Sequence, residues 1–134
     1  MIHHKTLFKE IFSLSIIVAV LHYVATIYSF YWSVDWFDIM MHFLGGLLMG
    51  LIAFWIFFTS EKINYPKDNS LVIFFTVVGF TLIIGLSWEL WEIFVGFTDV
   101  DLDMGDTILD IIMDVIGAIA AYYYGLLKTN FYKD

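Results

Sequence analysis

The sequence predicts an all-α membrane protein in which four transmembrane helices form one bundle and one domain, residues 1–134. Hydrophobic residues make up 61% of the chain and the mean hydropathy is +0.85, whereas apolar residues make up about half of a typical soluble domain. Four apolar runs approach or exceed the roughly 20 residues that a helix needs to cross a bilayer. We expect these spans at residues 7–31, 36–59, 71–95 and 107–127.

The connections between the runs support this division. The first run follows Lys5 and Lys9, as in a signal peptide, but it continues to about Phe30 without a convincing small-residue cleavage site. We therefore expect it to be retained as an anchor helix. Pro66, the only proline, lies between the second and third runs, where a helix breaker belongs.

The charges predict an orientation in the membrane. All six basic residues are lysines, which precede the first run, lie between the second and third, or follow the fourth. Four alternating spans place all of them on one side, and the positive-inside rule makes that side cytoplasmic. We thus expect an inner-membrane protein with both termini in the cytoplasm. The net charge of -8 argues against nucleic-acid binding, which needs a basic face.

Ionisable residues recur within the last three spans in pairs spaced three or four apart, so each pair shares one helix face. A rise of about 1.5 Å per residue divides them into two layers one turn apart. Exposing such groups to lipid costs about 2.5–3.5 kcal/mol each, so we expect them to converge inside the bundle. The outer layer is Asp38, Glu92 and Asp110, and the deeper layer is His42, Glu89 and Asp114.

These six residues form the predicted metal site. Oxygen-rich ligands favour Mg²⁺, Mn²⁺ or Ca²⁺, and the imidazole also admits Zn²⁺ or Fe²⁺. Two layers are compatible with two ions. Glu89 and Asp114 lie too deep to cap a helix and are the predicted catalytic groups, whereas Asp35 and Asp106 are predicted helix caps. Protons held by the same acids, as in a proton relay, are the alternative that the sequence leaves open.

Small residues recur four apart at Gly46 and Gly50 in the second run, and at Gly117, Ala121 and Gly125 in the fourth. Such ridges allow close packing of transmembrane helices. They predict helix packing within the chain and also offer a surface for a homo-oligomer.

The order of motifs resembles a known family pattern. Asp38-x-x-x-His42-Phe43-x-Gly45-Gly46, Trp88-Glu89-x-x-Glu92 and Asp110-x-x-x-Asp114-x-x-Gly117-Ala118 are similar to the VanZ-like small membrane proteins and to a neighbouring inner-membrane group of unknown function. The resemblance covers about the last hundred residues. It implies a compact helical bundle with its acidic motif near the outer face, and cell-envelope or lipid-linked substrates. Glu92 and Asp114 replace the glutamine and asparagine expected in VanZ-like proteins, which favours the neighbouring group.

Three functions fit these observations. The first is a metal-dependent enzyme that acts on an amphiphilic or lipid-linked substrate at the membrane, for example by hydrolysis or transfer at a phosphate. The second is a cation- or proton-coupled transporter, although the inner halves of the runs offer few polar groups for a path. The third is a non-catalytic membrane module that binds a partner or senses ions. The sequence does not decide whether the protein is an enzyme.

Overall fold

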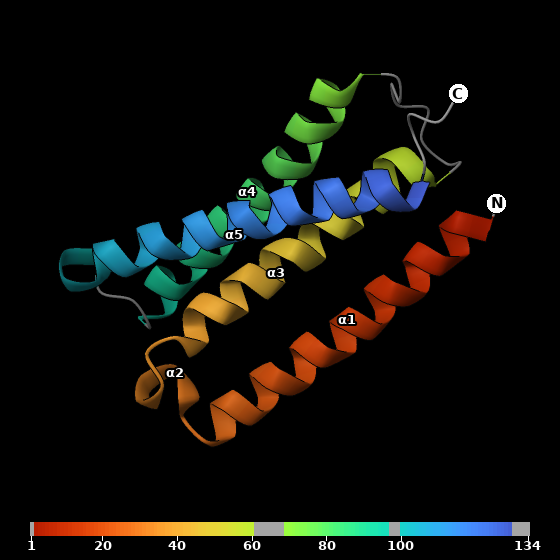
Figure 1. The fold of residues 1–134 in the computed structure, drawn as a ribbon. Helices are drawn as coiled ribbons and strands as arrows, with labels where there is room; N and C mark the ends of the chain where they lie inside the picture. Colours follow the sequence, from red (N-terminus) through yellow and green to blue (C-terminus); the bar gives the residue numbers. More distant parts are fainter. Residues whose placement is uncertain (1, 61–68, 97–99, 130–134) are drawn as a thin grey trace.

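The computed structural model is all-helical (Figure 1), as the sequence predicts, and it describes residues 2–60, 69–96 and 100–129, with side chains in the ranges 5–60, 69–96 and 104–129. A short stretch of π-helix, η1, continues the third helix without a break. The elements are α1 (Ile2–Ile27), α2 (Phe30–Ser33), α3 (Phe37–Phe54), η1 (Trp55–Thr59), α4 (Ser70–Val95) and α5 (Val100–Thr129).

Three of these helical segments are long and apolar enough to cross a membrane: Lys5–Ile27, Phe37–Thr59 and Ser70–Val95. They correspond to the first three predicted spans. The fourth predicted span corresponds to the larger part of α5, which carries five aspartates in its first half.

Two differences from the predicted helix boundaries change the interpretation of nearby residues. The first helix ends at Ile27 instead of residue 31, because the chain turns through Ser29, whose φ of 56° lies in the left-handed region, before the short α2 begins. The last helix begins at Val100 instead of residue 107. Asp106 therefore lies inside a helix and not at its cap. The cap predicted at Asp35 is also wrong, because α3 is capped by Trp36 without a side-chain hydrogen bond.

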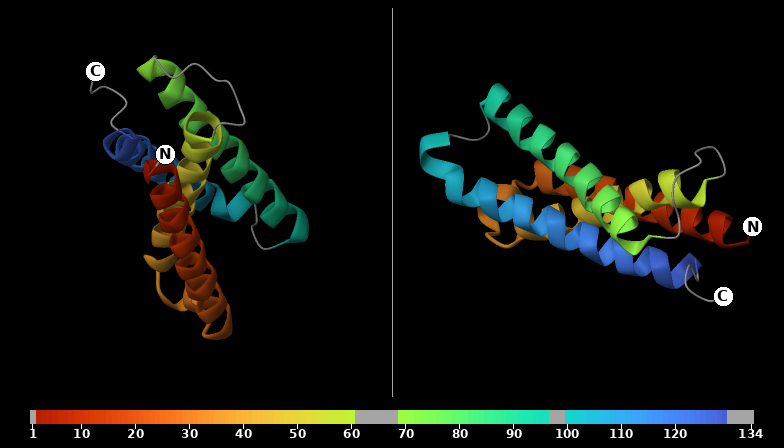
Figure 2. Two further views of the ribbon diagram at one scale, coloured as in Figure 1. Left: turned by 90° about the vertical axis from the view of Figure 1, so that its right-hand side faces the viewer. Right: turned by 90° about the horizontal axis from the view of Figure 1, so that it is seen from above.

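The central helix is α3, which packs against α1 on one side and against α4 and α5 on the other (Figure 1). Figure 2 shows from two further directions that α4 crosses α5, and that α1 lies apart from both over much of its length. Consecutive long helices run in opposite directions, so α3 and α5 run in the same direction. The first residues of α1 and the last described turn of α5 lie at the same end of the bundle.

Glycines let α3 and α5 approach to backbone contact. A Cβ atom added to Gly46 would lie 2.6 Å from the Cα of Asp114, and one added to Gly50 would lie 2.7 Å from the Cβ of Ala121. At Gly125, an added Cβ would lie 2.6 Å from the ring of Phe54. The predicted small-residue ridges are thus used for packing within one chain.

The end of the bundle that carries Lys128 is closed by a hydrophobic core. The core joins all four long helices, and among its members Leu7, Phe54, Ile73 and Ala118 are completely buried. At the same end, Lys128 Nζ donates a hydrogen bond to Glu10 Oε1 at 2.7 Å and ties α5 to α1. We call this end the lysine end.

Candidate metal centre

The predicted site residues lie at the end of the bundle opposite the lysine end. Asp38 and His42 occupy the first two turns of α3, Glu89 lies six residues before the end of α4, and Asp110 and Asp114 lie in the first half of α5. Because α4 runs against the other two helices, the last turns of α4 meet the first turns of α3 and α5. Three helices thereby bring five of the six predicted residues to one place.

The imidazole of His42 is at the centre of this cluster. Its Nε2 atom lies 3.7 Å from Asp38 Oδ1, 3.8 Å from Asp110 Oδ2 and 3.9 Å from Glu89 Oε1. Its Nδ1 atom lies 3.4 Å from Asp114 Oδ1. Four carboxylates therefore surround one imidazole. Three of them face Nε2, and the fourth faces Nδ1.

Three carboxylates of the cluster are buried, and two of these are incompletely hydrogen-bonded. Glu89 and Asp110 are each 3% exposed and Asp114 is 6% exposed. Both oxygens of Glu89 and the Oδ1 atom of Asp110 are buried without a hydrogen-bond partner. An unsatisfied buried carboxylate is costly, by several kcal/mol for a charged group. These oxygens consequently need a cation or a proton that completes their coordination.

Two glycines make room for Asp114. Gly46 on α3 contacts its backbone, and a Cβ atom at Gly85 on α4 would collide with its Oδ2 atom and lie 3.3 Å from its Cγ. The carboxylate of Asp114 therefore occupies the space that a side chain on α4 would need.

Glu92, the sixth predicted residue, has a different neighbour. Its Oε1 atom accepts a hydrogen bond from Trp88 Nε1 at 2.9 Å, one turn back on α4. The two predicted layers of three are replaced by a single cluster around His42. The prediction combined helix depth with the shared face of each pair, whereas the crossing of α4 over α5 decides which residues of α4 turn toward His42.

Sequence reasoning missed Tyr31, which is the last residue of the first predicted span. Its hydroxyl lies 2.7 Å from His22 Nδ1, and its ring packs edge-on against Phe37 with centroids 5.4 Å apart. Burial, followed by the negative charges of Asp38 and Glu92, raises the pKa of Tyr31 to about 12. Tyr31 thus experiences the negative potential of the cluster from the connection between α1 and α3.

The most compact part of the cluster is a three-residue group. Asp38, His42 and Asp110 each offer one ligand atom, and all three atoms lie within 4.8 Å of one another. Nitrogen and oxygen ligands bind divalent metals at about 2.0–2.2 Å, so one ion can bridge two atoms up to about 4.2 Å apart. Inward movement of about half an ångström would let one ion contact all three. This group can therefore hold a metal ion.

Residues 2–130 match the family described as "Predicted membrane protein (DUF2238)". The chain belongs to this family. The match covers the first helix as well as the region whose motifs resemble VanZ-like proteins, so the DUF2238 assignment describes nearly the whole chain. No curated protein and no solved structure matches the DUF2238 chain.

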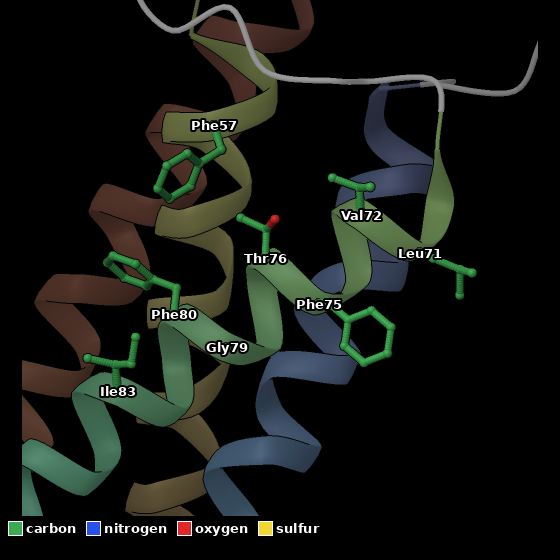
Figure 3. Close-up of a pocket in the computed structure, with 8 residues that line it drawn as sticks. All are labelled: Phe57, Leu71, Val72, Phe75, Thr76, Gly79, Phe80 and Ile83. Atoms are coloured by element: carbon green, nitrogen blue, oxygen red, sulfur yellow. The ribbon is translucent and has the colours of Figure 1, made fainter.

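A second concave feature of the DUF2238 chain lies away from the acidic cluster. It is a groove of about 560 Å³ on the lysine-end half of α4, next to η1. Figure 3 shows that its lining is almost wholly apolar, with Thr76 as the one hydroxyl-bearing side chain among those labelled. The groove offers no chemistry comparable to the cluster, and its composition suits contact with lipid chains.

Proposed function

We propose that this protein is a membrane-embedded binder of one divalent cation, held by Asp38, His42 and Asp110. The observation that carries the proposal is the burial of Glu89 and Asp110 at 3% exposure, with carboxylate oxygens that have no hydrogen-bond partner. A cation beside His42 Nε2 would lie among all three carboxylates that face this nitrogen and would offset their charge. One imidazole with carboxylates suits Mn²⁺, Fe²⁺ or Zn²⁺, and Mg²⁺ and Ca²⁺ remain alternatives.

The proposal includes four spans with both termini in the cytoplasm. Although α5 is not one of the three candidate spans that length and composition identify in the described residues, it follows α3 along its length, from the contact of Gly46 with Asp114 to that of Phe54 with Gly125. A helix packed in this way against a membrane-spanning helix shares its depth. Asp110 and Asp114 then face α3 and α4 instead of lipid, and the positive-inside rule puts the lysine end in the cytoplasm.

An enzymatic role is the second candidate, and Glu89 favours it. This side chain lies 3.9 Å from His42 Nε2 but outside the compact three-residue group, and both of its oxygens lack a hydrogen-bond partner. A carboxylate in that position would act as a general base toward water, and an ion held by Asp38, His42 and Asp110 would supply the Lewis acidity that makes water a better nucleophile. The substrate would be an amphiphilic or lipid-linked molecule that reaches the site from the outer leaflet. Glu89→Gln would then abolish turnover while the ion stays bound.

The transporter hypothesis gains no support from the rest of the bundle. On the lysine-end side of the cluster, the core side chains Phe54, Ile73 and Val77 are completely buried. Thr81 is also buried there, and its hydroxyl donates a hydrogen bond to the Val77 carbonyl. A path for ions needs two mouths, and the described core fills the place where the second would begin. A site reached from one side agrees better with binding or catalysis.

Metal binding is tested on the purified full chain in detergent. Mn²⁺ binding, followed by loss of the free-ion electron paramagnetic resonance signal, should reach one ion per chain. Asp110→Asn should abolish stoichiometric binding, whereas Asp35→Asn, which removes an exposed carboxylate just before α3, should leave it intact. An ion at 100 times its Kd should also raise the unfolding free energy of the wild type by about 2.7 kcal/mol. Wild-type protein that binds no Mn²⁺, Zn²⁺, Fe²⁺, Mg²⁺ or Ca²⁺ would leave protons as the counter-charge and refute the proposal.

A further inference from the structure

The two nitrogens of His42 face different partners. Nε2 is directed toward Asp38, Glu89 and Asp110, whereas Nδ1 lies 3.4 Å from Asp114 Oδ1. The compact ligand group is Asp38, His42 and Asp110, without Asp114, and both of its carboxylates lie near Nε2. An ion at Nε2 is therefore separated from the Asp114 carboxylate by the imidazole ring itself.

We infer that Asp114 is a positioning residue, which accepts the Nδ1–H of His42 and so presents the Nε2 lone pair to the ion. The inference rests on the proposed function and revises the sequence-based prediction, which made Asp114 a ligand and a catalytic group. Metal-binding histidines commonly donate their second ring N–H to a carboxylate, which fixes the tautomer and the ring orientation and raises the basicity of the ligating nitrogen. The 3.4 Å separation needs only a small closure to reach an ordinary hydrogen bond.

The surroundings of Asp114 are built for such a role. The residue is 6% exposed, its backbone contacts Gly46 on α3, and its Oδ2 atom occupies the space beside Gly85 on α4. These contacts leave the carboxylate little freedom, so it can hold the imidazole in a fixed orientation. A metal ligand in this cluster would have to move inward to reach an ion, and the restrained carboxylate of Asp114 is less suited to such a movement.

Gly85 provides a way to test the role without changing any charge. A Cβ atom at Gly85 would meet the Asp114 carboxylate and would displace it from His42. Gly79 lies on the same helix, and a Cβ atom added there would have nothing within 4 Å. Gly85→Ala and Gly79→Ala are therefore a matched pair that differ in whether they disturb Asp114.

The experiment measures Mn²⁺ affinity of the full chain in detergent for the wild type, Asp114→Asn, Asp110→Asn, Gly85→Ala and Gly79→Ala. Asp110→Asn should lose stoichiometric binding. Asp114→Asn should keep one ion per chain but bind it about 10–100-fold more weakly, the usual cost of removing the partner of a ligating histidine. Gly85→Ala should weaken binding in the same direction, and Gly79→Ala should match the wild type.

The absorption spectrum of bound Co²⁺ supplies a second readout. A positioning role predicts that Asp114→Asn keeps the wild-type ligand set, so the band intensities should stay close to those of the wild type. Complete loss of metal in Asp114→Asn, equal to that in Asp110→Asn, would make Asp114 a ligand and overturn the inference. Unchanged affinity in both Asp114→Asn and Gly85→Ala would also overturn it. A wild type that binds no ion would instead refute the proposed function.

Discussion

Replacing Gly46 with alanine should separate α3 from α5 and disrupt the cluster, because no space exists for even one methyl group. The added Cβ would lie 2.6 Å from the Cα of Asp114 and 2.7 Å from its carbonyl carbon, whereas nonbonded carbons prefer about 3.5–4.0 Å. The helices must then move apart by about 1 Å at this point. The obstacle is backbone, so a rotamer change cannot relieve the clash.

The expected cost is at the upper end of the range for overpacking, about 3 kcal/mol. That cost corresponds to a factor on the order of 100 in the folding equilibrium and, for a chain of this size, to a fall in Tm of roughly 10 °C. Gly45→Ala is the control, because a Cβ atom at the adjacent residue has nothing within 4 Å. There the greater helix propensity of alanine should change stability by at most about 1 kcal/mol, in the favourable direction.

Thermal unfolding in detergent, with Mn²⁺ binding measured in parallel, checks both effects. Gly46→Ala should lower Tm. It should also weaken metal binding, because the new Cβ displaces the Asp114 backbone on α5 and Gly46 itself lies one turn from His42 on α3. Gly117→Ala places its Cβ 2.9 Å from the carbonyl carbon of Gly46. It should likewise lower Tm and weaken metal binding. The double variant should cost less than the sum, because either change alone already separates the same helices. Equal Tm values for Gly46→Ala and Gly45→Ala would refute the reasoning.

Two further predictions concern groups outside the cluster. The Asn69 side chain accepts hydrogen bonds from the Leu71 and Val72 amides at the start of α4. Asn69→Ala should therefore lower the unfolding free energy by about 1 kcal/mol. An unchanged denaturation midpoint would count against this cap. The pKa of Tyr31 is raised from 10.0 to about 12, so the neutral phenol favours the folded state. Its contribution to the unfolding free energy is complete below pH 10 and is lost as the pH rises through about 12. In an ultraviolet absorbance titration, the difference between wild type and Tyr31→Phe should show one phenol ionising near pH 12, and a midpoint near 10 would contradict the burial of this hydroxyl beside Asp38 and Glu92.

The sequence was sufficient to predict most of the helices, because long apolar runs leave little choice in a membrane. The third predicted span, 71–95, differs by one residue from α4 (Ser70–Val95). The errors occur where local signals compete with tertiary structure. The run of acidic residues before position 107 is typical of a loop, yet α5 already begins at Val100. Nothing in the local pattern indicates that the chain turns at Ser29.

The site was predictable in its members but not in its geometry. Burial of unpaired acids in a membrane is costly, and this requirement brings six residues together in the prediction: Asp38, His42, Glu89, Glu92, Asp110 and Asp114. The structure places all of them except Glu92 around His42. Helix depth could not reveal that His42 would be central, because that depends on the rotation of each helix about its axis. The same rotation directs Glu92 toward Trp88. Tyr31 comes near Asp38 from the short α2, which the sequence did not predict.

The packing of α3 on α5 and the geometry of the cluster depend on each other. His42 and Gly46 are one turn apart on α3, so the face that contacts α5 through glycine is also the face that presents the imidazole. Asp110, Asp114 and Gly117 repeat this arrangement on α5. Without a counter-charge, the carboxylates that face one another across this contact repel and oppose the close approach. An ion bound between Asp38, His42 and Asp110 would attract both helices, so part of its binding free energy would stabilise the bundle. Metal affinity and helix packing should therefore rise and fall together in any variant that changes the separation of α3 and α5.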